Sequence, residues 1–214
     1  MSASILQPSL FSLGPQTLIE DAEGGVHYRP GVIDPDTAAR WFEALRDAVD
    51  WQSMRRPMYD RVVDVPRLVA GYKLERADLP EPLPRIAERV CAEVGHPFNA
   101  VGLNYYRDGR DSVAPHNDKL ATLVPGHPIA LLSLGSTRRM TIRAKEAPRA
   151  AVHIDLEPGS LLVMSHDSQR HYDHGIPKTS QDVPPRMSLA FRVRPDGQRS
   201  RKAGRTLQPT RPGR

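Results

Sequence analysis

Seven short runs rich in β-branched and aliphatic residues follow one another in the second half of the chain, most of them separated by turns that contain glycine or proline. They are residues 101–106, 129–134, 140–143, 152–156, 160–165, 171–176 and 187–193. No segment with a helical period lies between them, and such a succession is typical of an all-β sandwich or barrel. The sequence therefore predicts that this half of the protein folds as packed β-sheets.

Two amphipathic helices are predicted before these strands. The first begins at Asp34, a favourable N-cap residue, and places Phe42 and Leu45 on one face. The second covers residues 83–94, where apolar side chains recur four positions apart, and it ends at Gly95. We therefore expect a mainly β fold with flanking helices.

Composition divides the chain into an irregular N-terminal segment, a folded domain and a basic tail, which cover residues 1–33, 34–194 and 195–214. The N-terminal segment contains only two short β-rich runs, near residues 17–19 and 26–28. Within the folded domain, the predicted helices lie in residues 34–100 and the β-rich core covers residues 101–194.

The basic excess of the chain is concentrated at its end. The formal net charge is +5, but the residues from Arg194 to Arg214 hold seven basic side chains and one acid, a net +6. The rest of the chain is therefore close to neutral, at −1. One interpretation of the tail is a solvated, disordered segment. The other is a basic arm that adds salt-dependent affinity for phosphate groups.

A single cysteine, Cys91, excludes an internal disulfide framework and fits a reducing cytoplasm. It lies beside the apolar stripe of the second helix, which predicts a buried core thiol rather than a catalytic one. No apolar run approaches the roughly 18 residues that a membrane span needs, and the N-terminus lacks the pattern of a secretory signal. We therefore expect a cytoplasmic protein with no membrane segment and no obligate protein partner.

Three His-x-Asp pairs raise the question of a metal site, namely His116/Asp118, His153/Asp155 and His171/Asp173. Residues two apart on a strand share one face, so such a pair can present both side chains to one ion. A pair of this kind plus a later histidine makes the facial triad of two histidines and one carboxylate, which leaves positions on Fe(II) open for substrate and oxygen.

Spacing favours the first of these pairs. The pair at His153 alternates with apolar residues, so both of its polar side chains are expected on the surface of a strand. The pair at His171 is followed only by the adjacent His174. The pair at His116 precedes His171 and His174 by more than fifty residues, which is enough chain for one of them to reach it from a different strand. Spacing alone leaves the choice between His171 and His174 open.

The segment 186–192 supports the first pair. It alternates apolar side chains on one face with arginines or small side chains on the other. Arg186 and Arg192 would then project to one side of a strand, where they could bind a dicarboxylate. The alternative is that both arginines form ordinary surface ion pairs.

These motifs together resemble the AlkB family of Fe(II)- and 2-oxoglutarate-dependent dioxygenases, in particular its nucleic-acid demethylases. The resemblance covers roughly Met58–Pro195, and its core is the string Asn104–Asp118, which ends on the His-x-Asp pair. The later pieces that fit, in order, are Ile129–Met140, Pro158–Met164, His174–Pro177 and Pro185–Arg192. The fold that the resemblance implies is a double-stranded β-helix, or jelly roll, which agrees with the number of predicted strands.

The resemblance also implies a metal centre and its cosubstrates. It makes His116, Asp118 and His174 the iron ligands and so selects His174 over His171. The implied cofactor is Fe(II), with 2-oxoglutarate and O2 as cosubstrates.

The residues that the resemblance implies for binding 2-oxoglutarate are Asn104, Tyr106, Arg186, Ser188 and Arg192. Arg186 would pair with the far carboxylate of 2-oxoglutarate, and Arg192 would lie near its metal-proximal end. Ser188 stands where an asparagine is common in the family, a smaller polar group that could still serve the cosubstrate.

A substrate lid is implied within residues 34–100. Met58 and Tyr59 would then be candidates for a wedge that fills the gap left by an extruded base, and Tyr72 could line the base pocket. Ordinary packing is the alternative for each of these three residues.

One departure from the family concerns the substrate. Nucleic-acid repair members usually carry an acid two residues after the ligand aspartate, where it meets the base. Here that position is Leu120, after Lys119. The difference leaves iron binding untouched but leaves the identity of the alkylated base open.

The function implied is oxidative demethylation, or dealkylation, of N-alkylated bases in DNA or RNA, with release of an aldehyde, succinate and CO2, in a role that repairs alkylation damage. Two alternatives stay open. The same oxygenase chemistry could act on a protein or a small molecule, or the protein could be a catalytically silent jelly-roll binding module with a basic arm.

Overall fold

The computed structural model describes residues 14–58 and 61–195. Its larger sheet contains β1 (Gln16–Ile19), β2 (Val26–Arg29), β3 (Gln52–Met58), β4 (Arg61–Lys73), β5 (Ala100–Tyr106), β7 (Ile129–Gly135), β10 (Leu161–Met164) and β12 (Arg186–Arg192). Its smaller sheet contains β6 (Val113–His116), β8 (Arg138–Ala144), β9 (Ala151–Leu156) and β11 (Tyr172–Ile176). The helices are α1 (Pro35–Ala48), α2 (Leu83–Val94), α3 (Ser168–His171) and the short 3-10 helix η1 (Leu120–Thr122).

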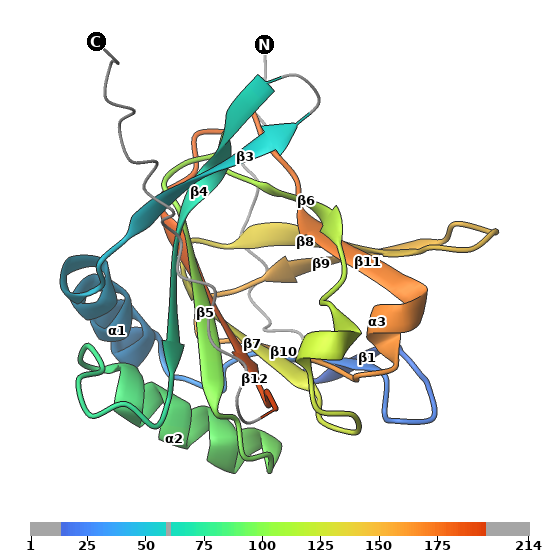
Figure 1. Ribbon diagram of the computed structural model, residues 1–214, viewed down its shortest axis with the longest axis horizontal. Helices are drawn as coiled ribbons and strands as arrows, with labels where there is room; N and C mark the ends of the chain where they lie inside the picture. Colours follow the sequence, from blue (N-terminus) through green and yellow to red (C-terminus); the bar gives the residue numbers. More distant parts are fainter. Residues whose placement is uncertain (1–13, 59–60, 196–214) are drawn as a thin grey trace, which may run out of the picture.

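The two sheets are antiparallel and face each other (Figure 1). The strand order is β1-β2-β10-β7-β12-β5-β4-β3 in the larger sheet and β6-β11-β8-β9 in the smaller one. Neighbouring strands are thus mostly far apart in sequence, as the crossing connections of a jelly roll require. The predicted mainly β fold with flanking helices is confirmed.

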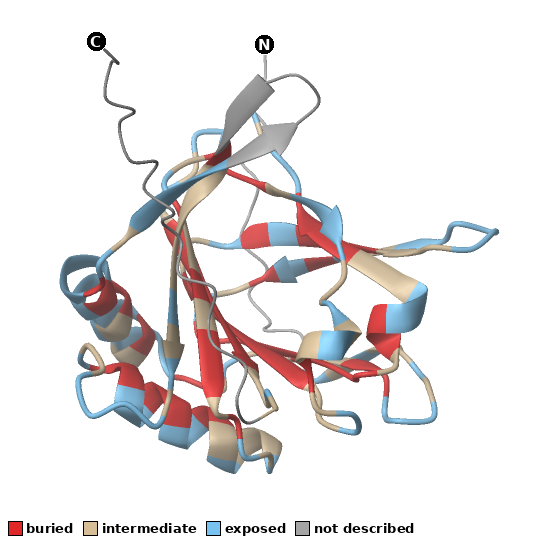
Figure 2. Ribbon diagram, viewed as in Figure 1, coloured by how far each residue is buried: buried red, intermediate tan, exposed pale blue. Residues whose placement is uncertain are grey.

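The larger sheet buries both of its faces. One face packs against α1 and α2, through a cluster that includes Leu45, Val90 and Leu132. The other face packs against the smaller sheet, through a cluster that includes Leu131 and Met140. Successive residues of a strand point to opposite faces, so neighbours such as Leu131 and Leu132 belong to different cores. Figure 2 shows the buried residues concentrated in these central strands and on the inward sides of the two helices.

Both predicted helices are confirmed. Asp34 caps α1, because its Oδ1 accepts a hydrogen bond from the Thr37 N–H at 2.9 Å. Helix α2 ends at Gly95, whose φ of 75° suits a residue without a side chain. Cys91 is half-buried rather than buried, because it lies at the edge of the apolar face of α2.

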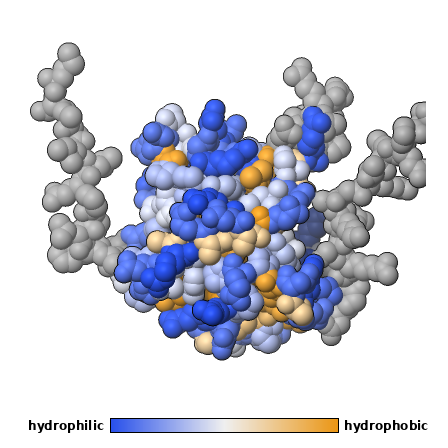
Figure 3. All heavy atoms as spheres, turned by 90° about the vertical axis from the view of Figure 1, so that its left-hand side faces the viewer, coloured by the Kyte–Doolittle hydropathy of each residue, from blue (hydrophilic) through white to orange (hydrophobic). Residues whose placement is uncertain are grey.

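The side of the molecule that carries α1 and α2 is mostly hydrophilic, with apolar residues only in small separate patches (Figure 3). The apolar faces of these helices are therefore used in the core. None of the helices in the two described ranges is long and apolar enough to cross a membrane.

The end of the N-terminal segment belongs to the larger sheet and is not a separate irregular part. β2 pairs with β10 along its whole length, and β1 pairs with β2. Val26 and Tyr28 are buried in the core between the sheets. The boundary predicted at residue 34 therefore cuts through the larger sheet. No local pattern indicates this pairing, because β10, the partner of β2, lies some 130 residues further along the chain.

The segment assigned to a substrate lid contains β3 and β4. β4 pairs with β5 over residues 68–73, and β3 and β4 continue together beyond the rim of the sheet (Figure 1). This hairpin and the short β6 are strands that the sequence did not predict.

Candidate active site

Two histidines face one another across neighbouring strands of the smaller sheet. His116 ends β6, and His174 lies directly opposite it in β11. The centroids of their rings are 4.6 Å apart. Asp118 follows His116 by two residues, and its charge acts on the pKa of His174. The fold thus gathers the three residues that were predicted to bind a metal.

β11 can approach β6 this closely because the residue after His174 is glycine. A Cβ at Gly175 would lie 2.8 Å from the carbonyl oxygen of Val113 and 3.0 Å from the nitrogen of Pro115. A side chain at this position would push the two strands apart. Gly175 therefore sets the separation of the two histidines.

The carboxylate of Asp118 is held by Arg192. Arg192 donates from Nε to Oδ2 at 2.6 Å and from Nη2 to Oδ1 at 3.1 Å, and each side chain is 15% exposed. Burial raises the pKa of Asp118, but the charge and the hydrogen bonds of Arg192 outweigh it and hold the pKa below its ordinary value. Within the described ranges no three His, Cys, Asp or Glu side chains form a ready-made metal group, and both Asp118 oxygens face Arg192.

His174 is held in the neutral form. Burial, with a further contribution from nearby His116, lowers the pKa of His174 to about 4. A neutral imidazole keeps a nitrogen lone pair free, which is the form that binds a metal. His171 differs, because its side chain is 56% exposed and its Nε2 lies 3.7 Å from Asp167. The structure therefore brings His174, and not His171, to His116.

Arg186 is a buried cation with too few partners. It is 0% exposed, and Nη2 donates to the Ser133 hydroxyl at 2.9 Å. Its Nε and Nη1 are buried without a hydrogen-bond partner. Burial lowers the pKa of Arg186 to about 10, so the guanidinium stays charged at neutral pH. A carboxylate would supply the missing acceptors and the missing charge. The surface ion pair considered for Arg186 is therefore wrong.

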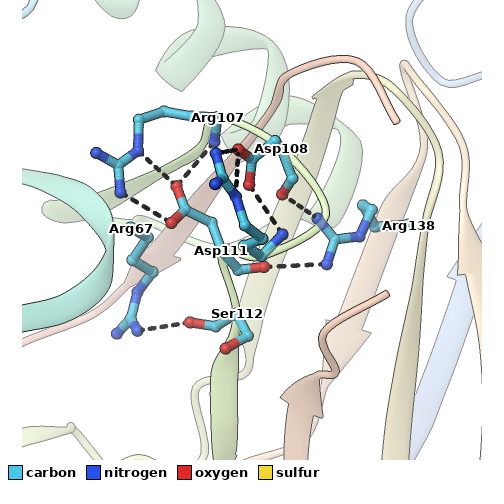
Figure 4. A network of polar contacts seen from close by, with 7 residues as sticks. Arg67, Arg107, Asp108, Asp111, Ser112 and Arg138 are labelled. Carbon is cyan, nitrogen blue, oxygen red and sulfur yellow. Dashed lines mark hydrogen bonds and ion pairs between the residues drawn. The ribbon is translucent and has the colours of Figure 1, made fainter. Parts of the chain in front are cut away.

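A second buried arginine gives a contrast (Figure 4). Arg138 donates to the carbonyl oxygens of Asp108, Asp111 and Pro177, at 3.0, 3.1 and 2.8 Å. The ring of Tyr106 lies near both guanidinium groups, 5.8 Å from that of Arg138 and 5.3 Å from that of Arg186. The hydrogen bonds of Arg138 to backbone oxygens join the loop after β5 to the end of β11. In Arg186, by contrast, Nε and Nη1 have no acceptor.

Replacing Arg138 with methionine is expected to destabilise the protein by about 3 kcal/mol, because three carbonyl oxygens lose a charged donor. Urea unfolding measures the change. The adjacent Arg139 offers a matched control, since it is exposed and paired with Asp155 at the surface, and Arg139→Met should cost less than about 1 kcal/mol. Equal stability of the two variants would contradict this role of Arg138.

The five residues predicted to bind 2-oxoglutarate share one side of the larger sheet. On paired strands β5 and β12, Asn104 lies opposite Ser188, and Tyr106 lies opposite Arg186. Asn104 Nδ2 donates to the Ser188 hydroxyl at 3.5 Å, and its Oδ1 accepts from Arg67 Nε at 2.7 Å. These side chains lie between the two sheets, on the side away from the helices.

The family profile of the 2OG-Fe(II) oxygenase superfamily matches residues 25–199, which is most of the chain. The chain belongs to this superfamily.

In sequence, the oxygenase is similar to AlkB-like proteins, and in fold it is similar to a solved structure of one of them. The mouse protein named DNA oxidative demethylase ALKBH2 is 38% identical over 117 residues, which are 51% of this chain and 49% of the relative. The human protein of the same name is 37% identical over 51% of this chain and 45% of the relative. Mouse alpha-ketoglutarate-dependent dioxygenase alkB homolog 3 is 32% identical over 78% of this chain and 65% of the relative. The match thus spans about half the length of ALKBH2. The structure of OsALKBH1 shares the fold, with a TM-score of 0.56 and 15% identity over 79% of this chain and 96% of that one.

Membership of the superfamily implies Fe(II), 2-oxoglutarate and O2, and the oxygenase has residues that fit them. Two imidazoles and one ionised carboxylate are the donor set that suits Fe(II). The unpartnered N–H groups of Arg186 fit an anionic cosubstrate such as 2-oxoglutarate. His116, Asp118 and His174 would therefore hold the metal, and Arg186 would bind a carboxylate.

The residues predicted to contact substrate have a different outcome. Tyr72 pairs with Val101 in the sheet and packs in the core next to the helices. Because successive residues of a strand point to opposite faces, Tyr72 lies on the helix-covered face of the larger sheet and Asn104 on the other. The assignment of Tyr72 to the base pocket is therefore wrong. Tyr59 and the side chain of Met58 lie outside the described residues, and their assignment to a wedge stays a prediction.

Sequence reasoning missed several residues that shape this site. They are Arg67, Ser133 and Arg138. Only Arg138 had a signal, since Arg138 and Arg139 directly precede the strand predicted at residues 140–143. If the strand began two residues earlier, as β8 does, the two side chains would point to opposite faces and one of them inward. Arg67 and Ser133 act through partners distant in sequence, which no local pattern indicates.

Proposed function

We propose that this oxygenase removes N-alkyl groups from bases in DNA or RNA, and that it repairs alkylation damage in the cytoplasm. The observation that carries the proposal is Arg186, a fully buried cation between the two sheets. Two of its guanidinium nitrogens lack a hydrogen-bond partner, and the smaller of the two sheets carries the histidine pair. A silent binding module would gain nothing from this arrangement, because an uncompensated buried charge destabilises a fold.

Each side chain has a definite task in this function. When bound, Fe(II) with O2 and 2-oxoglutarate supplies the oxidation that converts an N-methyl group to formaldehyde. His116, Asp118 and His174 hold the metal, and Arg192 orients the Asp118 carboxylate. Arg186 binds the far carboxylate of 2-oxoglutarate. Arg186 is fully buried beside the apolar core between the sheets, which keeps water away from the carboxylate-binding end of the site.

Nucleic acid is the favoured substrate because relatives with 37–38% identity are named DNA oxidative demethylase. A base must leave its stack to reach such a pocket, and the β3–β4 hairpin beyond the rim of the sheet is suited to contact a strand of nucleic acid (Figure 1). A protein or small-molecule substrate is the second candidate, favoured by exposed Lys119 and half-buried Leu120 where an acid would meet the base.

Formaldehyde release tests the substrate class. Wild-type protein with Fe(II) and 2-oxoglutarate would be given a panel of single- and double-stranded DNA and RNA oligonucleotides, each carrying one N-methylated base. We expect release from at least one methylated oligonucleotide and none from its unmethylated match. Turnover of 2-oxoglutarate without formaldehyde from any member would favour the second candidate. Absence of turnover above that of His116→Ala would favour the silent module.

Deleting residues 197–214, which lie outside the described residues, is expected to weaken oligonucleotide binding while leaving 2-oxoglutarate turnover intact. The deletion removes six basic side chains and no acid, so fewer counterions are released on binding and the salt dependence of affinity becomes shallower. Binding measured at several salt concentrations tests this. An unchanged salt slope would show that the basic tail has no part in binding.

A further inference from the structure

The backbone of Asp118 is held by a side chain from the other ligand-bearing segment. The N–H of Asp118 donates to Gln169 Oε1 at 3.0 Å. Gln169 belongs to α3, which leads directly into β11 and His174. It is 1% exposed. Because a backbone N–H can only donate, the oxygen of the Gln169 amide must face Asp118 and its nitrogen must point away.

The other end of this amide begins a buried chain of hydrogen bonds. Gln169 Nε2 donates to the Ser168 hydroxyl at 3.1 Å. Ser168 donates from its N–H to the Ser165 hydroxyl at 2.9 Å and from its own hydroxyl to the Ser165 carbonyl at 2.7 Å. The Ser165 hydroxyl donates to Asp21 Oδ2 at 2.5 Å. Both serines are buried, and every hydroxyl has one donor and one acceptor role, so the directions of the bonds are mutually consistent.

The chain ends on the turn between β1 and β2. Asp21 Oδ1 accepts from the N–H groups of Glu23 and Gly25, each at 2.8 Å. Asp21 therefore belongs to a turn that its own side chain stabilises, and this turn is attached to the larger sheet through β2. The N-terminal hairpin, which the sequence separated from the folded domain, is thereby connected to the metal-binding segment.

Helix α3 does not depend on the Gln169 side chain for its position. Lys145 Nζ donates to the carbonyl oxygens of Gln169 and Arg170, at 2.7 and 3.1 Å. The Lys145 backbone N–H also donates to the carbonyl of His171 at 2.9 Å. Removing the Gln169 amide should therefore leave α3 in place and release only the backbone of Asp118.

We propose that Gln169 is a positioning residue for the metal ligand Asp118, anchored through Ser168 and Ser165 to Asp21 in the N-terminal hairpin. The inference rests on the metal centre of the proposed function. A fixed backbone limits the directions that the Asp118 carboxylate can take. The carboxylate can then contact both Arg192 and the metal without losing much more conformational freedom on metal binding. The predicted consequence is a loss of metal affinity when any link in the chain is cut.

Two measurements on Gln169→Met test this, one of which needs no metal. In the metal-free protein, the Asp118 amide should exchange with deuterium faster than in wild type, since methionine has no acceptor for it. Titration with Co2+ should show affinity lowered by about 10- to 100-fold. Gln181→Met is the matched control, because Gln181 is exposed and distant from Asp118 in the chain, and it should match wild type in both measurements.

Asp21→Ala tests the distal end of the chain without touching the helix that carries Gln169. It should change both quantities in the same direction by a smaller factor. Unchanged Asp118 exchange and unchanged Co2+ affinity in Gln169→Met would overturn the inference, and an Asp21→Ala variant identical to wild type would overturn the anchoring by the hairpin. Failure of wild-type protein to bind Co2+ would instead contradict the metal centre, while the exchange measurement would still decide the role of Gln169.

Discussion

Replacing His174 with alanine is expected to lower 2-oxoglutarate turnover by more than about a hundredfold, because one of three predicted metal ligands is lost. Its pKa of about 4 keeps this imidazole neutral and able to bind a metal throughout the neutral range. The 7% exposure of His174 means that water cannot easily replace it. Release of CO2 from 2-oxoglutarate measures the effect.

His171→Ala is the matched control for this prediction. The residue lies three positions away, and its side chain is largely exposed and lies near Asp167. We expect its turnover to equal that of wild type. Equal losses in the two variants, or loss in His171→Ala alone, would show that the site is assigned to the wrong histidine.

Replacing Arg186 with methionine is expected to raise the KM for 2-oxoglutarate by more than about a hundredfold, since a charge-assisted pair with a buried carboxylate is lost. The cosubstrate-free protein should nevertheless keep or gain stability. Two nitrogens of Arg186, Nε and Nη1, have no hydrogen-bond partner, so methionine removes an unsatisfied buried charge while filling a similar volume. Thermal unfolding with and without 2-oxoglutarate measures both effects, because a ligand raises Tm only where it binds.

Arg138→Met should show the opposite pattern, with a loss of stability in the absence of 2-oxoglutarate. Both arginines are buried near the same tyrosine ring. Their size and charge are equal, and they differ most clearly in their hydrogen-bond partners. If Arg186→Met proved as destabilising as Arg138→Met and still bound 2-oxoglutarate, Arg186 would be a structural residue and the assignment of the cosubstrate pocket would fail.

Most of the fold was accessible from sequence because its strands are apolar on one or both faces. The helix at residues 83–94 was predicted with its observed ends, and the seven predicted strands are all present. The hairpin β3–β4 and strand β6 were missed for a physical reason. β6 has three exposed residues out of four, and a strand without a buried face leaves no hydrophobic alternation to detect.

The metal site was predictable in part. His116 and Asp118 stand two apart, a spacing that predicts a shared direction where both residues lie on one strand. In the structure β6 ends at His116, and Asp118 follows it with its N–H held by Gln169. Spacing left the choice between His171 and His174 open, and only the resemblance to the AlkB family selected His174. Its position opposite His116 in the β6–β11 pair gives the physical reason. The role of Gln169 could not be predicted, because its contact with Asp118 spans 51 residues and depends on how α3 enters β11.

The most direct test of the account is a coupled assay on a single oligonucleotide with one N-methylated base, in which formaldehyde and consumed 2-oxoglutarate are measured together. We predict that wild-type protein with Fe(II) forms formaldehyde in step with 2-oxoglutarate consumption, that the unmethylated oligonucleotide yields none, and that His174→Ala yields none from either. Consumption of 2-oxoglutarate that never yields formaldehyde, or equal formaldehyde from wild type and His174→Ala, would contradict the assignment of this protein as a nucleic-acid demethylase.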